Sequence, residues 1–87
     1  MIARDDRPRM SKLYRMQFEP TQDHWVLLYP EGMVRLNLSA AEILHRCDGQ
    51  RTVDQIVAEL EAAFAQASLH DEVIGFLSEA RQRGWLQ

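Results

Sequence analysis

The stretch HWVLLYPEGMVRLNLSAAEIL, from His24 to Leu44, decides the fold that this sequence predicts. Its first part, His24–Tyr29, is apolar after the histidine, which is typical of a central strand covered on both faces. Pro30-Glu31-Gly32 then predicts a tight turn. Proline holds φ at the value that the start of a turn needs, and glycine has the backbone freedom needed where the chain leaves the turn. Met33–Asn37 follows as a second strand, whose alternate side chains point to opposite faces.

One more strand is expected before this stretch. In residues 13–19, LYRMQFE, large apolar side chains alternate with polar ones. That period of two predicts a half-buried strand. Three strands that follow one another closely along a chain most simply form an antiparallel meander.

Helix signals mark the rest of the chain. Ser39–Glu42 fits a capping box and predicts a first helix with Ser39 as its N-cap. A second capping box, Thr52–Gln55, starts a helix that should run to about Ala65, and a third helix should run from Ser68 to Gly84. Strands first and helices after predict an α+β fold, here a winged-helix-like domain with a three-stranded antiparallel meander followed by three helices.

The first twelve residues, MIARDDRPRMSK, are polar and contain Pro8. We interpret residues 1–12 as a mobile N-terminal arm and residues 13–87 as a single domain, since 87 residues suffice for one. The basic side chains of the arm could contact an acidic partner.

The charge distribution argues against nucleic-acid binding. The net charge is −3, and residues 39–87 hold four Lys or Arg against eight Asp or Glu. The second helix, which would be the recognition helix of a winged-helix protein, has no Lys or Arg between Thr52 and Phe64 and would repel phosphate. A small dimeric winged-helix DNA-binding regulator therefore stays only as the alternative function.

No constellation of catalytic or metal-binding side chains is evident. His24, His45 and His70 lie on different expected elements, and the lone Cys47 falls on an apolar helix face where burial is expected. No glycine-rich phosphate loop is present. We therefore expect no catalytic residue, no metal and no cofactor. The lack of a long apolar segment or a signal peptide favours the cytoplasm.

The predicted strand Met33–Asn37 would be an edge of the sheet, with unpaired backbone groups that a peptide strand could join. The third helix carries a second line, Ile74, Leu77 and Arg81, which could pack on such a peptide. Alternatively, the helix covers the edge, this line faces the core, or a second copy pairs with the edge as a homodimer. The candidate peptide-binding residues are Met33, Val34, Arg35, Leu36, Asn37, Ile74, Leu77 and Arg81.

Several pieces of the sequence occur together in a known family. They are LLYPEGMVRLN (27–37), the helix start at 39–44, the turn at 47–49 with the helix at 52–60, and the closing residues 83–86. In this order and spacing they resemble the PqqD family, pyrroloquinoline quinone biosynthesis protein D, over residues 13–87.

The resemblance implies a non-catalytic peptide chaperone. Members bind the ribosomal precursor peptide PqqA and present it to PqqE, a radical S-adenosylmethionine enzyme. Related domains hold a leader peptide as an added strand against their third strand and third helix, which here implies Met33–Asn37 and the line of Ile74, Leu77 and Arg81. Leu36→Pro is expected to abolish peptide binding by removing a backbone donor from the strand.

Overall fold

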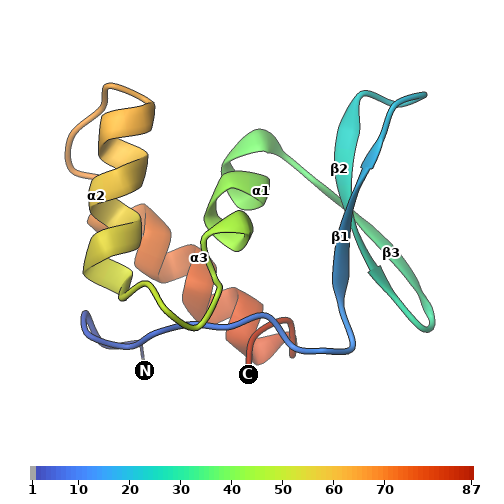
Figure 1. Cartoon of the computed structure of the whole chain (residues 1–87), viewed down its shortest axis with the longest axis horizontal. Coiled ribbons are helices and arrows are strands. Elements are labelled where there is room, and N and C mark those ends of the chain that lie inside the picture. Colours follow the sequence, from blue (N-terminus) through green and yellow to red (C-terminus); the bar gives the residue numbers. More distant parts are fainter. Residues whose placement is uncertain (1) are drawn as a thin grey trace.

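The computed structural model describes residues 2–87 as three strands followed by three helices (Figure 1). The order and the α+β class predicted from the sequence are confirmed. The elements are β1 Arg15–Glu19, β2 His24–Tyr29, β3 Gly32–Leu36, α1 Leu38–His45, α2 Val53–Ala63 and α3 His70–Gln82.

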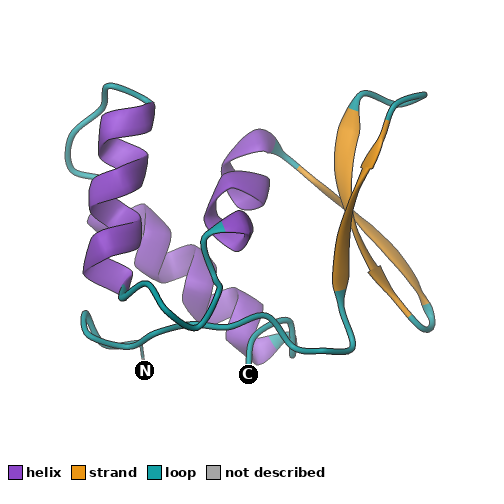
Figure 2. Cartoon of the chain, viewed as in Figure 1, coloured by secondary structure: helices purple, strands orange, loops and turns teal. Residues whose placement is uncertain are grey.

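The sheet is an antiparallel meander in the order β1-β2-β3. Phe18 of β1 lies opposite Trp25 of β2, and Trp25 lies opposite Leu36 of β3, so these three side chains share one face. Trp25 and Leu36 pack in the main core with the helices, which lie together on one side of the sheet (Figure 2).

The central strand is buried on both faces, as its apolar sequence predicts. Leu27 and Val26 are both 0% exposed although they are neighbours and therefore point in opposite directions. Leu27 belongs to the main core, whereas Val26 lies on the outer face between Gln17 and Arg35 of the flanking strands. Long side chains on those strands can cover Val26 without a second layer of helices.

The first helix has a different cap from the predicted one. Asn37 is the N-cap of α1, and its Oδ1 accepts a hydrogen bond from the backbone N–H of Ala40 at 2.8 Å. The expected capping box at Ser39 is wrong because β3 ends at Leu36 and the helix begins at Leu38, so that Ser39 lies inside the first turn. Asn and Ser are about equally good caps, and position in the chain decides between them here.

We expect Asn37→Ala to lower the free energy of unfolding by about 1 kcal/mol, because the Ala40 N–H loses its acceptor. Ser39→Ala is the matched control and should change it by less than about 0.5 kcal/mol. Urea unfolding followed by circular dichroism measures both. Equal losses for the two variants would contradict the assignment of the cap.

Two other predicted helix ends, the start of α2 and the end of α3, agree closely with the structure. Thr52 and Gln55 form the expected capping box of α2, each side chain accepting from the backbone of the other. Gly84 adopts φ +81 after α3, and the Trp85 N–H donates to the Ala80 carbonyl at 2.9 Å. Those contacts form a glycine-terminated Schellman cap.

The start of α3 lies later than predicted. Ser68 adopts φ +63, a left-handed conformation that a helical residue does not take, and α3 begins at His70. The N-cap, Leu69, has no side-chain hydrogen bond of its own to offer. Its backbone N–H instead donates to Glu61 Oε2 of α2 at 3.0 Å, which ties the two helices together.

Residues 2–12 lie along the helices rather than extending into solvent (Figure 1, dark blue). Ile2 is 6% exposed and Pro8 is fully buried. The carbonyl groups of Arg4 and Asp6 accept hydrogen bonds from the first N–H groups of α2, at 3.0 and 2.9 Å. Helix N-termini lack internal partners for these donors, so the segment completes α2. This placement differs from the mobile arm that the sequence predicts. The prediction rests on the polar side chains, whereas backbone carbonyl groups hold the segment in place.

Candidate functional site

β3 is an edge strand that pairs with β2 on one side only among the described residues. Tyr29 and Gly32 face each other across the two-residue turn, which makes them a hydrogen-bonded pair. Because such pairs alternate in antiparallel strands, Val34 and Leu36 direct their backbone groups toward β2. The backbone N–H and C=O groups of Met33 and Arg35 therefore point toward the free edge.

The imidazole of His24 agrees with this alternation. Its Nδ1 lies 3.2 Å from the carbonyl oxygen of Leu36, on the side of β3 that faces β2. The last pairing position of β3 is thus held both by the ladder and by a side chain of β2. The inner side of the strand is fixed, and the outer side keeps its backbone groups for another strand.

A groove of about 270 Å³ lies between β3 and α3, and we call it the β3–α3 groove. Phe76 and Trp85 lie near each other in it, with ring centroids 6.3 Å apart. The Arg83 guanidinium lies 5.7 Å from the centre of the Trp85 ring and donates to Glu79 Oε1 at 3.0 Å. The groove is apolar within and charged at its rim. Its lining consists of Val34, Phe76, Glu79, Ala80, Arg83 and Trp85.

The structure places the predicted strand residues in different roles. Val34 is half-buried and lines the groove, whereas Met33 and Arg35 are exposed. Leu36 is 3% exposed and belongs to the core, so only its backbone lies near the site. Asn37 is occupied as the cap of α1.

The predicted helix line does not face the groove. Leu77 is 0% exposed in the core, and Ile74 packs against the core as a partly buried side chain. At 100° per residue, Ile74 and Arg81 lie roughly 160° around α3 from the side chains that line the groove. The sequence shows two apolar stripes on this helix, but it does not say which one meets β3. The groove residues that the sequence prediction does not include are Phe76, Glu79, Ala80, Arg83 and Trp85.

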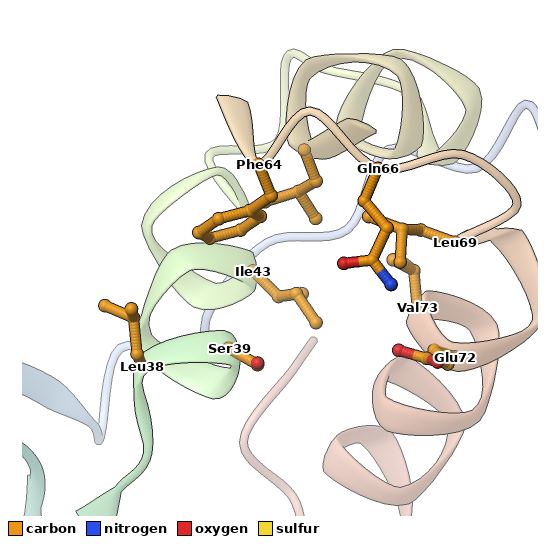
Figure 3. A pocket seen from close by; sticks show the side chains of 9 residues that line it. Leu38, Ser39, Ile43, Phe64, Gln66, Leu69, Glu72 and Val73 are labelled. Carbon is orange, nitrogen blue, oxygen red and sulfur yellow. The ribbon is translucent and has the colours of Figure 1, made fainter. Parts of the chain in front are cut away.

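A second cavity, of about 340 Å³, opens between the three helices, and we call it the three-helix cavity. Figure 3 shows side chains of α1 on one side and of α3 on the other, with Phe64 and Gln66 between them at one end. Leu38 is 64% exposed and Phe64 is 39% exposed, so large apolar side chains reach solvent here. The lining consists of Leu38, Ser39, Ile43, Leu60, Phe64, Gln66, Leu69, Glu72 and Val73.

Two arginines near the start of α2 are neutralised by carboxylates. Arg46 bridges Glu42 and Glu59 at 2.9 and 3.1 Å, and Arg51 bridges Glu59 and Asp48 at 2.9 and 2.8 Å. Hydrogen bonds from the backbone N–H groups of Arg51 and Gln50 hold the pKa of Asp48 below its usual range. Both guanidinium groups are committed within the chain, so this surface does not offer the free positive charge that a nucleic acid needs.

Cys47 is buried as predicted, with 5% of its surface exposed, and its Sγ lies 3.3 Å from the Ile43 carbonyl oxygen, to which it donates. Burial raises the pKa of the thiol from an ordinary value near 9 to about 12. The thiolate is the reactive form of cysteine, so this side chain is a packing residue and not a nucleophile.

The raised pKa of Cys47 predicts a pH dependence of stability. The protonated thiol is favoured by folding, so its contribution is complete below about pH 9 and is lost as the pH rises toward 12. We expect the free energy of unfolding to fall over this range more steeply than in Cys47→Ala. Urea unfolding of both proteins between pH 8 and 11 measures the difference. Parallel pH profiles would contradict the assigned pKa.

Residues 2–87 contain neither a metal-binding cluster of His, Cys, Asp or Glu side chains nor a membrane-spanning helix. Among them no group of three His, Cys, Asp or Glu side chains is placed to hold a metal ion. No helix in this part of the chain has the length and apolar character needed to cross a membrane.

Comparison with known proteins places the chain in a family. Residues 24–86 match the family model described as coenzyme PQQ synthesis protein D (PqqD). The chain is 45% identical over 84 residues to the PqqA binding protein of Azotobacter vinelandii, covering 95% of this chain and 91% of the relative. It is 46% identical over 80 residues to the PqqA binding protein of Rahnella aquatilis, covering 91% and 84%.

Two solved structures are similar to the fold. One is the solution structure of the PqqD part of Methylobacterium extorquens PqqCD, described as a functional, stand-alone recognition element for ribosomally synthesized, post-translationally modified peptides. It matches with a TM-score of 0.84 and 27% identity over 100% of this chain and 95% of that one. The crystal structure of PqqD from Xanthomonas campestris matches with a TM-score of 0.60 and 31% identity, covering 100% and 99%. With a family model over most of its length and relatives above 40% identity, the chain belongs to the PqqD family.

Proposed function

We propose that this chain is a non-catalytic peptide chaperone that binds the precursor peptide PqqA and presents it to the radical S-adenosylmethionine enzyme PqqE in pyrroloquinoline quinone biosynthesis. The relatives are named for binding PqqA, and one solved relative is described as a peptide-recognition element. The structural observation that carries the proposal is the free edge of β3 beside the β3–α3 groove.

In this proposal the peptide joins the sheet as a fourth strand. The backbone groups of Met33 and Arg35 pair with it, because those of Val34 and Leu36 are directed to β2. Its alternate side chains enter the groove, where Phe76 and Trp85 supply apolar surface. Backbone pairing holds an extended chain with little demand on its sequence, and the groove sets its register.

In this proposal the domain presents the peptide to the enzyme by tethering it close to the active site. A disordered precursor that is held by this domain and by the enzyme together reaches the active site at a high effective concentration, even when each contact is weak. The exposed acidic faces of α2 and α3 and the basic side chains of residues 4–12 offer surfaces for docking the enzyme. A second copy of the chain could also pair with the edge of β3, and such a homodimer would compete with the peptide.

An amide NMR titration of the labelled protein with synthetic PqqA tests the proposal. We expect the largest shifts at residues 33–37 and 76–85, and none of comparable size with a scrambled peptide. Adding PqqE should then broaden the signals of the bound domain, as expected for a larger complex. Shifts confined to other surfaces, or no shifts with and without PqqE, would contradict the proposed function.

A further inference from the structure

We propose that the three-helix cavity binds one large apolar side chain of the same peptide, four residues along from the side chain in the β3–α3 groove. This inference rests on the proposed function and adds a second anchor to it. The cavity has no role in the pairing with β3. It is a separate hollow between α1, α2 and α3 (Figure 3).

The helix α3 fixes the distance between the two anchors. Leu69, Glu72 and Val73 line the three-helix cavity, whereas the helix residues that line the β3–α3 groove come later in the chain and are Phe76, Glu79, Ala80 and Arg83. The centres of the two sets are about eight residues apart, which is on the order of 12 Å along a helix. An extended peptide covers that distance in about four residues. Four is an even number, so both anchoring side chains point to the same face of the peptide.

The chain path brings the peptide to the cavity. β3 ends at Leu36, and Leu38 and Ser39, which follow at once in α1, line the cavity. A strand that pairs with β3 and runs past its end therefore meets these residues next. The free edge, the groove and the cavity thus lie along one continuous route for an extended chain.

The chemistry of the cavity suits a large apolar side chain with a basic neighbour. At about 340 Å³ the cavity is near the lower limit for ligand pockets, so it suits one large side chain better than a folded element. Binding there would cover the exposed apolar surface of Leu38 and Phe64. Glu72 lies at the lining and Asp71 is exposed beside it, which favours Lys or Arg next to the anchor.

The inference is tested by combining substitutions in the peptide with substitutions in the protein. Alanine variants of synthetic PqqA are titrated against the wild-type domain, against Ser39→Phe, which fills the cavity, and against Ala58→Phe. Ser39 and Ala58 are both exposed helix residues, but Ala58 does not line the cavity, so it is the matched control. Amide spectra of the variants report whether each remains folded.

Two apolar peptide positions four residues apart should each lose at least tenfold in affinity for the wild-type domain. Ser39→Phe should bind the intact peptide about tenfold more weakly and become insensitive to alanine at one of the two positions. Ala58→Phe should still lose affinity when alanine replaces either of the two peptide residues. The inference is overturned if Ser39→Phe keeps both sensitivities, if the spacing is not four, or if Ser39→Phe alters only self-association. Failure of every protein variant to bind the peptide would overturn the proposed function as well.

Discussion

Arg35→Pro is expected to weaken PqqA binding by at least tenfold while the domain stays folded. The backbone N–H of Arg35 points to the free edge of β3, so proline removes a donor that a fourth strand would use and places ring atoms in its path. An edge strand tolerates proline where its N–H faces solvent. A tenfold loss corresponds to about 1.4 kcal/mol, the size of one strong backbone hydrogen bond.

Arg35→Ala is the control, because it removes the same charge and keeps the N–H. Isothermal titration calorimetry with synthetic PqqA should give Arg35→Ala nearly the wild-type affinity. Any loss of affinity should be no larger than removal of one exposed charge explains. Equal losses in both variants would mean that the guanidinium, and not the backbone, is recognised. Unchanged affinity in Arg35→Pro would rule out strand addition at this edge.

Leu36→Pro, which the sequence favours as the test, is a poorer one. Leu36 is 3% exposed in the core, its backbone faces β2, and its carbonyl oxygen lies 3.2 Å from the His24 imidazole. Proline there removes a ladder bond and a core side chain, so we expect unfolding, and lost binding would not identify the site. The sequence indicates an edge strand, but only the register shows which of its residues face outward.

Elements whose start or end depends only on a few neighbouring residues can be predicted from the sequence. The turn before Gly32, the capping box at Thr52 and the glycine cap at Gly84 all depend on neighbours within a few residues, and the structure confirms all three. The cap of α1 is also local, but Asn37 and Ser39 compete for it and the end of β3 decides. A pattern that fits two positions equally well cannot choose between them.

The groove-facing side of α3 depends on contacts between distant elements. Ile74 and Phe76 are both apolar, and the helix alone gives no reason to assign one to the core and the other to a groove. The rotation of α3 about its axis is set by the packing of Leu77 and Ala80 against the remaining core. Sequence periodicity does not fix that rotation, so the sequence locates the edge strand but does not show which face of α3 lines the groove beside it.

Deleting residues 2–8 is expected to lower the free energy of unfolding by about 3 kcal/mol. Burial of Ile2 and Pro8 contributes about 2 kcal/mol after the entropy of ordering the segment is subtracted, and the backbone acceptors that cap the first turn of α2 contribute about 1 kcal/mol more. Such a loss is a large fraction of the stability of a small domain. Urea unfolding measures this loss of unfolding free energy. The dependence of the unfolding free energy on urea concentration is compared between the two proteins.

Arg4→Ala is the matched control for this deletion. The Arg4 guanidinium lies 4.0 Å from Asp54, and both side chains are mostly exposed, so the ion pair should contribute less than about 0.5 kcal/mol. If the deletion leaves the unfolding free energy unchanged, residues 2–8 form the solvated arm that their composition suggests. If Arg4→Ala reproduces the loss, charge rather than backbone pairing holds the segment.

The same segment links the stability of the fold to the site. Three residues beyond the deleted segment, the Ser11 N–H donates to the carbonyl oxygen of Trp85 at 2.8 Å, and Trp85 lines the β3–α3 groove. Deletion of residues 2–8 spares this bond, so peptide affinity should change little at temperatures where the protein remains folded. Extending the deletion through Ser11 frees Trp85, and affinity for PqqA should then fall together with stability. Equal affinities of the two deletion variants would show that Trp85 is held by Phe76 and α3 alone.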